Sequence, residues 1–394
     1  MAARKRHHSE GNAGVDRLSD LPDEVLGHIL SFLPTEKAVQ TSALSKRWKG
    51  VFSLATSLEF HDYYKKTPFI NFVDRVLSLH KVSIRRFKLT VWRSIGQSHV
   101  SCVNAWTASA LSLGAQQLDL ELRYQMDDMT QHKLLNSCTM TVLKLKYYYD
   151  RAILKVPMSV CLSSLRVLNL ERIIFPDVNS TSRFFLGCSS LTDLTLSSCE
   201  WMDGQVYSVS CAKLRNLTIS DLGYYNYTKN PTIELDLPVL VYFKCCSIPQ
   251  KLFHIKNPVV ICTAEFDFNS SISYDKTDVF FIRLMRQLSN VKVLRLFGEA
   301  LTVISRIKLS KLPATFVNLT RLEVGSRYGR KREGWRRLPK LIARSPLLET
   351  LVFKEGLETC YNELAIFLDD QRKPISKNHI TIQVDAYWGS SKNL

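Results

Sequence analysis

The sequence lacks the segments that would direct a protein into a membrane or out of the cell. Its first eight residues are mostly polar or basic, and no stretch approaches the roughly 18 consecutive apolar residues of a membrane span. We therefore expect a soluble intracellular protein with no membrane partner, located in the nucleus and/or the cytoplasm. The 10 cysteines are scattered without a Cys-x-x-Cys pair, which predicts buried, reduced thiols and no zinc site.

Motifs that support catalysis are also missing. The chain has no phosphate-binding Gly-x-x-x-x-Gly-Lys-Ser/Thr loop, no Gly-x-Gly-x-x-Gly, no Gly-x-Ser-x-Gly elbow and no His-Glu-x-x-His. We expect no enzyme activity, no catalytic residue, no cofactor and no bound metal.

Positive charge, by contrast, is abundant. The 53 Lys and Arg residues against 36 Asp and Glu give a formal net charge of +17, which favours acidic partners without saying anything about the fold. One segment, 327–344, concentrates this charge and also holds two aromatic residues. It could bind an acidic protein segment, a phosphorylated ligand or nucleic acid, or it could be a solvated loop and polar helix face. Its candidate target-binding residues are Arg327, Arg330, Lys331, Arg332 and Arg336.

The N-terminal part divides into a tail and a small helical module. Residues 1–15 hold a basic run followed by small polar residues, which predicts a disordered basic tail. Between residues 16 and 56 the pattern is helical, because Leu21, Val25, Ile29 and Leu33 recur at every fourth position. Three short helices cannot bury all of these apolar side chains among themselves. Part of their surface should therefore be an interface.

The rest of the chain is built from an internal repeat of the form apolar-x-x-apolar-x-apolar. Successive copies are separated by 21 to 31 residues, close to the period of leucine-rich repeats, roughly 20 to 29 residues. The middle apolar residues of the copies are Phe87, Leu118, Leu143, Leu168, Leu194, Leu217, Phe243, Ala264, Leu294, Leu322 and Leu351.

This repeat predicts an α/β fold in which short parallel strands stack into an open, curved sheet. The last two apolar residues of each copy alternate along a strand and point inward, and the residue between them faces out. We expect the repeats over 57–355 and a capping segment over 356–394. Only Cys199 matches the strand-ending residue that hydrogen-bonds the turn in regular repeats, so we expect an irregular solenoid. Return segments such as 182–186 and 340–345 should pack as helices or turns on the outer face.

Tyrosines follow two of the predicted strands, near the rim of the concave face. They could anchor a target protein at low cost in entropy, although lining a repeat turn is the commoner use of such residues. The candidates are Tyr147, Tyr149, Tyr224 and Tyr225.

The helical module resembles the F-box of the large plant F-box/LRR family. The likeness is carried by DRLSDLPDEVL at 16–26, ILSFLP at 29–34 and LSKRW at 44–48, and by repeat phrases such as MTVLKL at 140–145 and LRVLNL at 165–170. Within 314–355, the apolar residues and the phrase SPLLETL at 345–351 are similar to the opening of the FBD module. The later half of that module is not recognisable.

The resemblance implies a three-helix F-box that docks the Skp adaptor of a cullin-RING ubiquitin ligase, and through it the cullin and RING subunits. Carried over to this sequence, the adaptor contacts are Leu21, Pro22, Val25, Leu26, Ile29, Leu30, Leu33, Val39, Leu44, Arg47 and Trp48. The alternative is that some of them only fill the core of the bundle, Val39 and Leu44 most readily, Pro22 and Trp48 least.

We therefore predict a non-catalytic substrate-recognition subunit of an SCF-type ubiquitin ligase, whose repeats bind an unknown target protein. The rival interpretation is a basic nucleic-acid-binding repeat protein, although nucleic acid is not the partner we expect. A family member that docks the ligase without a target is also compatible with the sequence.

Overall fold

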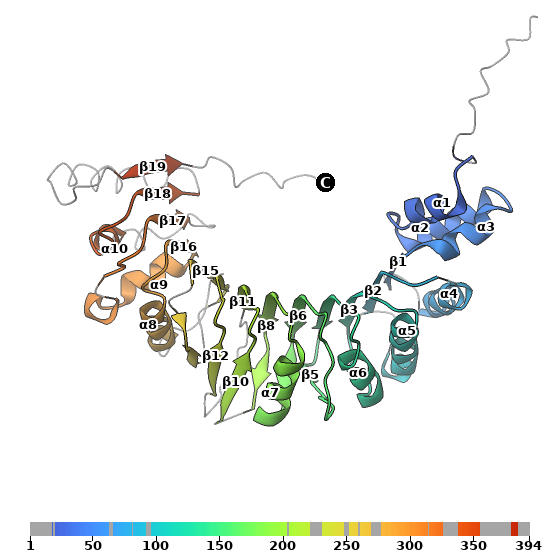
Figure 1. The fold of residues 1–394 in the computed structure, drawn as a ribbon, viewed down its shortest axis with the longest axis horizontal. Coiled ribbons are helices and arrows are strands. Elements are labelled where there is room, and N and C mark those ends of the chain that lie inside the picture. Colours follow the sequence, from blue (N-terminus) through green and yellow to red (C-terminus); the bar gives the residue numbers. More distant parts are fainter. Residues whose placement is uncertain are drawn as a thin grey trace, which may run out of the picture.

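The fold is an arc of stacked repeats with a helical module at its N-terminal end (Figure 1). The structure, a computed structural model, describes residues 18, 20–62, 66–80, 82–91, 96–202, 205–220, 231–247, 252–258, 261–268, 277–313, 315–325, 338–354 and 380–384. The strands line the inner side of the arc and the larger helices cover its outer side. This is the predicted α/β solenoid with an open sheet.

The inner side is one parallel sheet, which has 13 strands within the described ranges. In spatial order they are β1 (Ser57–His61), β2 (Arg86–Val91), β3 (Gln117–Leu122), β4 (Val142–Tyr147), β6 (Val167–Glu171), β8 (Asp193–Ser197), β11 (Asn216–Ser220), β13 (Tyr242–Cys245), β15 (Thr263–Phe268), β16 (Val293–Gly298), β17 (Arg321–Gly325), β18 (Thr350–Phe353) and β19 (Thr381–Val384). All 11 predicted middle residues lie opposite one another in register from β2 to β18. Leu58 and Ile382 extend this row at its two ends.

The outer side is covered by helices that return the chain to the next strand. They are α4 (Lys66–Leu79), η3 (Gln97–His99), α5 (Val100–Ser112), α6 (Asp128–Leu135), α7 (Val178–Gly187), α8 (Thr277–Gln287), α9 (Ala300–Arg306), η5 (Leu309–Lys311) and α10 (Leu338–Ile342). The return segments predicted near 182 and 340 are thus α7 and α10. In the described residues, no helix is both long and apolar enough to cross a bilayer.

Local sequence explains where the outer helices begin. The side chain of Asp177 accepts the backbone N–H of Ser180 at 2.8 Å, and Asp127 does the same for Thr130 at 2.6 Å. Each carboxylate thus satisfies one of the free N–H groups at the start of a helix and sits at the positive end of the helix dipole.

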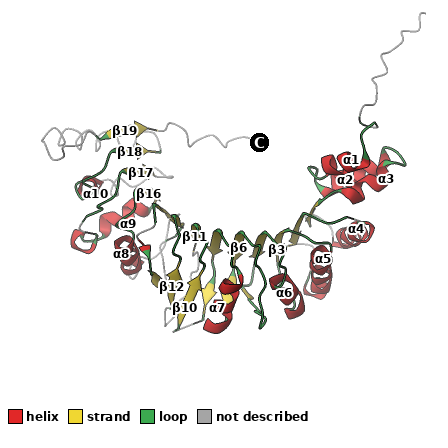
Figure 2. Ribbon diagram, in the orientation of Figure 1, coloured by secondary structure: helices red, strands yellow, loops and turns green. Residues whose placement is uncertain are grey.

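The middle of the outer side has short strands where the flanking repeats have helices (Figure 2). One small sheet consists of β5 (Ala152–Ile153), β7 (Ile173–Phe175) and β9 (Glu200–Trp201), and the other of β10 (Val206–Ser210), β12 (Thr232–Asp236) and β14 (Leu252–Ile255). This mixture makes the solenoid irregular, as expected. Cys199, predicted to hydrogen-bond the turn backbone, lies within hydrogen-bond distance of two carbonyl oxygens, that of Leu170 inside β6 at 3.5 Å and that of Ser197 at the end of β8 at 3.6 Å.

The N-terminal module consists of α1 (Asp23–Leu30), α2 (Thr35–Gln40), η1 (Thr41–Ala43), α3 (Trp48–Val51) and η2 (Phe52–Leu54). Its buried residues belong to the same continuous core as those of the repeats. It also covers the first strand, because the hydroxyl of Thr35 accepts the backbone N–H of Glu59 in β1 at 2.7 Å. An exposed strand edge would otherwise offer free N–H groups to other chains. The module therefore caps the solenoid.

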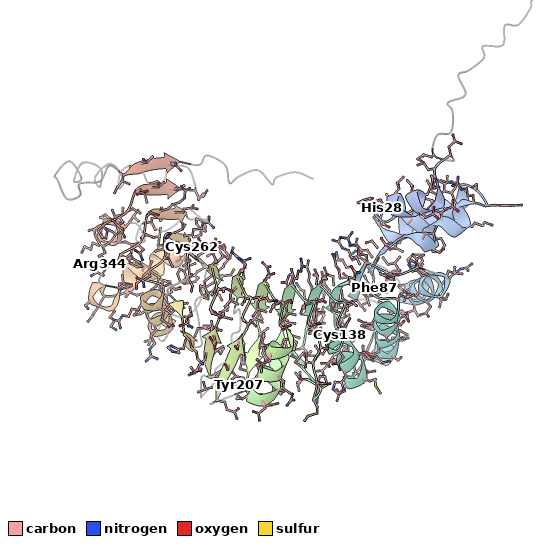
Figure 3. The ribbon with its side chains drawn as sticks, in the orientation of Figure 1. His28, Phe87, Cys138, Tyr207, Cys262 and Arg344 are labelled. Atoms are coloured by element: carbon pink, nitrogen blue, oxygen red, sulfur yellow. A yellow bond between two sulfur atoms is a disulfide. The ribbon has the colours of Figure 1, made fainter. Side chains whose placement is uncertain are left out.

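The prediction that every cysteine is a reduced thiol is wrong for one pair. Cys138 and Cys161 lie in the turns that lead into the neighbouring strands β4 and β6, and they form a disulfide with a Cα–Cα distance of 5.3 Å. Their scattered positions in the sequence hid this contact, since only the stacking of successive repeats brings the two turns together. Of the other described cysteines, four are buried: Cys188, Cys199, Cys211 and Cys245. Figure 3 labels Cys138 on the arc.

Candidate protein-binding surfaces

One side of α1 is fixed against the module by close packing. Gly27 lies so near η2 that a Cβ atom placed on it would stand 2.7 Å from Cβ of Leu54, and 3.1 Å from its carbonyl oxygen. The hydroxyl of Ser31 accepts the backbone N–H of Thr56 at 2.8 Å and donates to the Gly27 carbonyl at 2.9 Å. These contacts decide which face of α1 points to the core and which to solvent.

Arg47 fastens the start of α1 to the segment before α3. Its Nε donates to Oδ1 of Asp23 at 2.8 Å, and its terminal nitrogen donates to the Leu21 carbonyl. The ion pair is half-exposed, so its net contribution to stability is small, and its geometric role matters more. Arg47, predicted as an adaptor contact, therefore also holds the module together.

The module carries six large apolar side chains that solvent can reach. We call this set the apolar face; it consists of Leu18, Val25, Ile29, Phe32, Leu33 and Leu44, whose exposed fractions range from 39% to 76%. Solvent exposure of six large apolar side chains on one small module is typical of a surface that another protein covers. His28 packs edge-on against Phe32, with ring centroids 5.0 Å apart; Figure 3 labels His28 on the module.

Three of the predicted adaptor contacts lie in the interior instead. Leu26, Leu30 and Trp48 are at most 9% exposed and belong to the continuous core. The reason is the rotation of α1 fixed by Gly27, which turns Leu26 and Leu30 inward.

The remaining predicted contacts are divided between surface and core. Pro22, Val25, Ile29, Leu33 and Leu44 are exposed, whereas Leu21 and Val39 are half-buried against the core. Leu44, for which filling the core was the alternative interpretation, is 70% exposed, whereas Trp48, for which that alternative was weaker, is buried. Leu18 and Phe32 were not predicted, although Phe32 stands three residues after Ile29 on the same helical stripe.

The inner side of the arc is a second surface that a partner could contact. Along its centre runs a row of side chains, one from each strand, that alternate with the core residues; Glu265, Glu323 and Val352 among them are at most 7% exposed. In order they are Glu59, Lys88, Asp119, Lys144, Asn169, Thr195, Thr218, Lys244, Glu265, Arg295, Glu323, Val352 and Gln383. We call this the concave row.

Charges near both ends of the concave row neutralise one another. Lys88 pairs with Glu59 at 2.8 Å, and Lys144 with Asp119 at 3.7 Å. Toward the other end, Glu265 pairs with Lys244 at 2.7 Å. The sign alternates from strand to strand because opposite charges on adjacent strands attract and like charges repel.

The pKa of Glu265 shows how complete this neutralisation is. Burial of its carboxyl acts to raise the pKa, but hydrogen bonds from Lys244 and Tyr242 and the charge of Arg295 outweigh burial and hold the pKa below the ordinary 4.5. The hydroxyl of Tyr242 donates to Oε2 of Glu265 at 2.7 Å. Glu265 is therefore ionised at neutral pH, and its charge is already used within the protein.

The centre of the concave row is different, since it carries no charge. Asn169, Thr195 and Thr218 are half-buried, and none of their side chains hydrogen-bonds another residue in the described ranges. An uncharged centre with unused hydrogen-bonding groups, bordered by charged residues, matches the general composition of protein interfaces.

Comparison with known proteins bears on both surfaces. The F-box domain family matches residues 18–55. A putative F-box/FBD/LRR-repeat protein of Arabidopsis thaliana is 30% identical over 359 residues, covering 86% of this chain and 69% of its own length. An F-box/LRR-repeat protein of the same plant is 30% identical over 361 residues, covering 86% of this chain and 91% of its own length. The chain belongs to the plant F-box/LRR-repeat family.

In this F-box/LRR-repeat protein the apolar face lies within the matched F-box, and the concave row lies in the repeats. The F-box implies binding to a Skp-family adaptor in SCF-type complexes. A third relative, an F-box/FBD/LRR-repeat protein of Arabidopsis thaliana, is 35% identical over 239 residues, 58% of this chain and 52% of its own length.

Seven of the nine predicted target-binding residues lie outside the described residues, as do the tail 1–15 and most of 356–394. They are Tyr224, Tyr225, Arg327, Arg330, Lys331, Arg332 and Arg336. Tyr147 is buried, and burial raises the pKa of its phenol, so its side chain cannot serve as an exposed anchor. The alternation of Tyr147 with Leu143 and Leu145 along the strand was the signal that its side chain points inward.

Tyr149 is exposed and lies beside Arg123. In the described ranges, no three His, Cys, Asp or Glu side chains gather as they would around a metal ion.

Proposed function

We propose that this protein is a non-catalytic substrate-recognition subunit of an SCF-type ubiquitin ligase. Its F-box would bind a Skp-family adaptor through the apolar face, and the adaptor would connect it to the cullin and RING subunits. The single observation that supports this most is the apolar face itself, six large side chains left in water on a module that otherwise packs tightly. We propose the nucleus and/or the cytoplasm as the location.

The concave row would bind the target protein, with its centre at Asn169, Thr195 and Thr218. Paired charges on either side would form the rim of the contact, since they need no partner to be neutral. The target's contact segment should be uncharged where it meets the centre, because a charge there would lose water without gaining a partner.

The way the F-box joins the repeats supports a role in positioning. Because the module and the repeats share one core, a target on the concave row would be held at a fixed orientation to the adaptor. Holding two reactants in a fixed geometry raises their effective concentration, which is what a recognition subunit supplies to the transfer reaction. The transfer chemistry would belong to the other subunits.

The direct test is reconstitution with a recombinant Skp-family adaptor. The full chain, co-expressed with the adaptor and passed over a sizing column, should elute as a one-to-one complex. Removing the F-box would be a poor control, because the module caps β1 and its loss would expose the edge of the sheet. A folded chain that shows no binding at micromolar concentrations would refute the adaptor assignment.

Nucleic-acid binding remains the second candidate because of the net charge of +17. It predicts DNA or RNA affinity that falls steeply with salt concentration, with no adaptor complex. The neutralised concave row gives this candidate no support.

A further inference from the structure

A cavity of about 470 Å³ opens at the rim of the arc, where the strands β3 and β4 end. Arg123 follows the last residue of β3, and Tyr147 ends β4 and lines the cavity. Tyr124, Asp150 and Arg151 come from the turns that follow these strands. The C-terminal ends of parallel strands meet along one edge of a sheet, and polar side chains from several turns converge there. The volume lies within the usual range of small-molecule sites, roughly 300 to 1,000 Å³.

Arg123 is held in this cavity by aromatic rings. Its Cζ lies 4.8 Å from the ring centroid of Tyr149 and 5.3 Å from that of Tyr124. The backbone of Tyr149 is itself fixed, because its carbonyl accepts a hydrogen bond from Arg172 at 3.1 Å. Ring contacts orient a guanidinium without occupying its N–H groups. Among the described residues, no carboxylate or carbonyl accepts a hydrogen bond from Arg123.

Neighbouring carboxylates are committed to other cations. Glu200 pairs with Arg151 at 2.7 Å, and both side chains are largely buried. Glu171 pairs with Lys146 at 3.2 Å. Asp150 also lines the cavity, is exposed, and has no partner in the described ranges. Among the described residues, Asp150 is the carboxylate that lines the cavity together with Arg123.

We propose that this cavity binds an oxyanion, a carboxylate or a phosphoryl group, through the guanidinium of Arg123. The two oxygens of such a group match the parallel N–H bonds of a guanidinium. The tyrosine rings and Val100 and Ala152 on the walls favour an apolar or aromatic body attached to the anion. The source could be a free small molecule or an acidic or phosphorylated side chain of a target protein. The proposal goes beyond the proposed function and does not depend on adaptor binding.

Calorimetry on the full chain with phenyl phosphate tests the site. Arg123→Gln should weaken binding about tenfold or more, because it removes charge-assisted hydrogen bonds. Arg123→Lys should recover only part of the affinity, since an ammonium keeps the positive charge but lacks the two parallel N–H donors of the guanidinium. Asp150→Asn should strengthen binding about two- to fivefold, because it removes a nearby exposed negative charge. Arg166→Gln is the matched control, since Arg166 is exposed and lies outside the cavity; it should bind as the wild type does.

A second probe distinguishes the two sources. It is a short, otherwise uncharged peptide that contains one phosphotyrosine. Tighter binding of the peptide than of phenyl phosphate assigns the site to a target side chain, and the reverse assigns it to a free molecule. An Arg123→Gln variant that melts at the wild-type temperature and binds either probe as tightly as the wild type would overturn the proposal. So would a wild-type protein that binds neither probe. Adaptor binding, measured on the same samples, keeps this result separate from the proposed function.

Discussion

Replacing Ile29 and Leu44 by alanine should weaken adaptor binding while leaving the protein folded. The two side chains are 39% and 70% exposed, so a corresponding part of their apolar surface is still available to a partner. Burying a whole side chain of this type is worth about 1.5 to 3 kcal/mol. The exposed parts then correspond to about 0.5 to 1 kcal/mol for Ile29 and about 1 to 2 kcal/mol for Leu44. Together these amount to roughly a 10- to 100-fold loss of affinity.

The assay is biolayer interferometry of the full chain against an immobilised Skp-family adaptor, with thermal melting followed by circular dichroism. The double variant should melt within a few degrees of the wild type, because Leu44 is mostly exposed and the packed part of Ile29 contributes only about 1 to 2 kcal/mol to folding. Trp48→Ala provides the contrasting case. Its side chain is buried, so truncation should cost about 3 to 5 kcal/mol of folding stability, and any loss of binding should follow unfolding.

One result would refute this reasoning about the apolar face. It is a folded double variant whose affinity for the adaptor lies within twofold of the wild-type value. In that case the adaptor, if it binds, must use another part of the module, and the exposed side chains would need a different explanation.

Three further predictions concern stability. Gly27→Ala should destabilise the module by about 1 to 3 kcal/mol, because the new Cβ collides with Leu54. Gly50→Ala is the control and should not destabilise it, because nothing lies within 4 Å of its added Cβ. The midpoints of denaturant-induced unfolding measure the difference between the two variants. Because the pKa of Glu265 is lowered in the fold, its ionised form stabilises the protein at neutral pH, and this contribution is lost as the pH falls below about 4.5 through the lowered pKa. Glu265→Gln should remove that part of the acid dependence in thermal melts between pH 7 and pH 3. An unchanged dependence of the melting temperature on pH would contradict this prediction. Asp177→Ala should cost about 1 kcal/mol by removing the cap of α7, and amide hydrogen exchange should rise first in that helix.

The site was only partly predictable, and α1 shows why. Its apolar stripe is broad, so the periodicity alone identifies a helix without saying which residues face the core. Leu26 and Val25 are neighbours of equal character in the sequence, yet one is buried and the other exposed. The close approach at Gly27 makes that choice, through a contact with Leu54, 27 residues later in the chain.

The spacing of the apolar triplets was enough to predict the 11 strands of the main sheet from β2 to β18 and their register. Each strand needs two inward apolar residues at alternate positions, and each repeat is covered by the next, so equivalent residues of successive triplets lie side by side. Contacts between segments that are distant in the sequence became visible only in the folded chain. Folding placed Trp48 in the core and Leu44 in solvent, joined Cys138 to Cys161 across two turns, and set Arg123 between two tyrosine rings. A periodic pattern shows which positions of the repeats are equivalent, but the contacts between side chains of distant segments depend on how the whole chain packs.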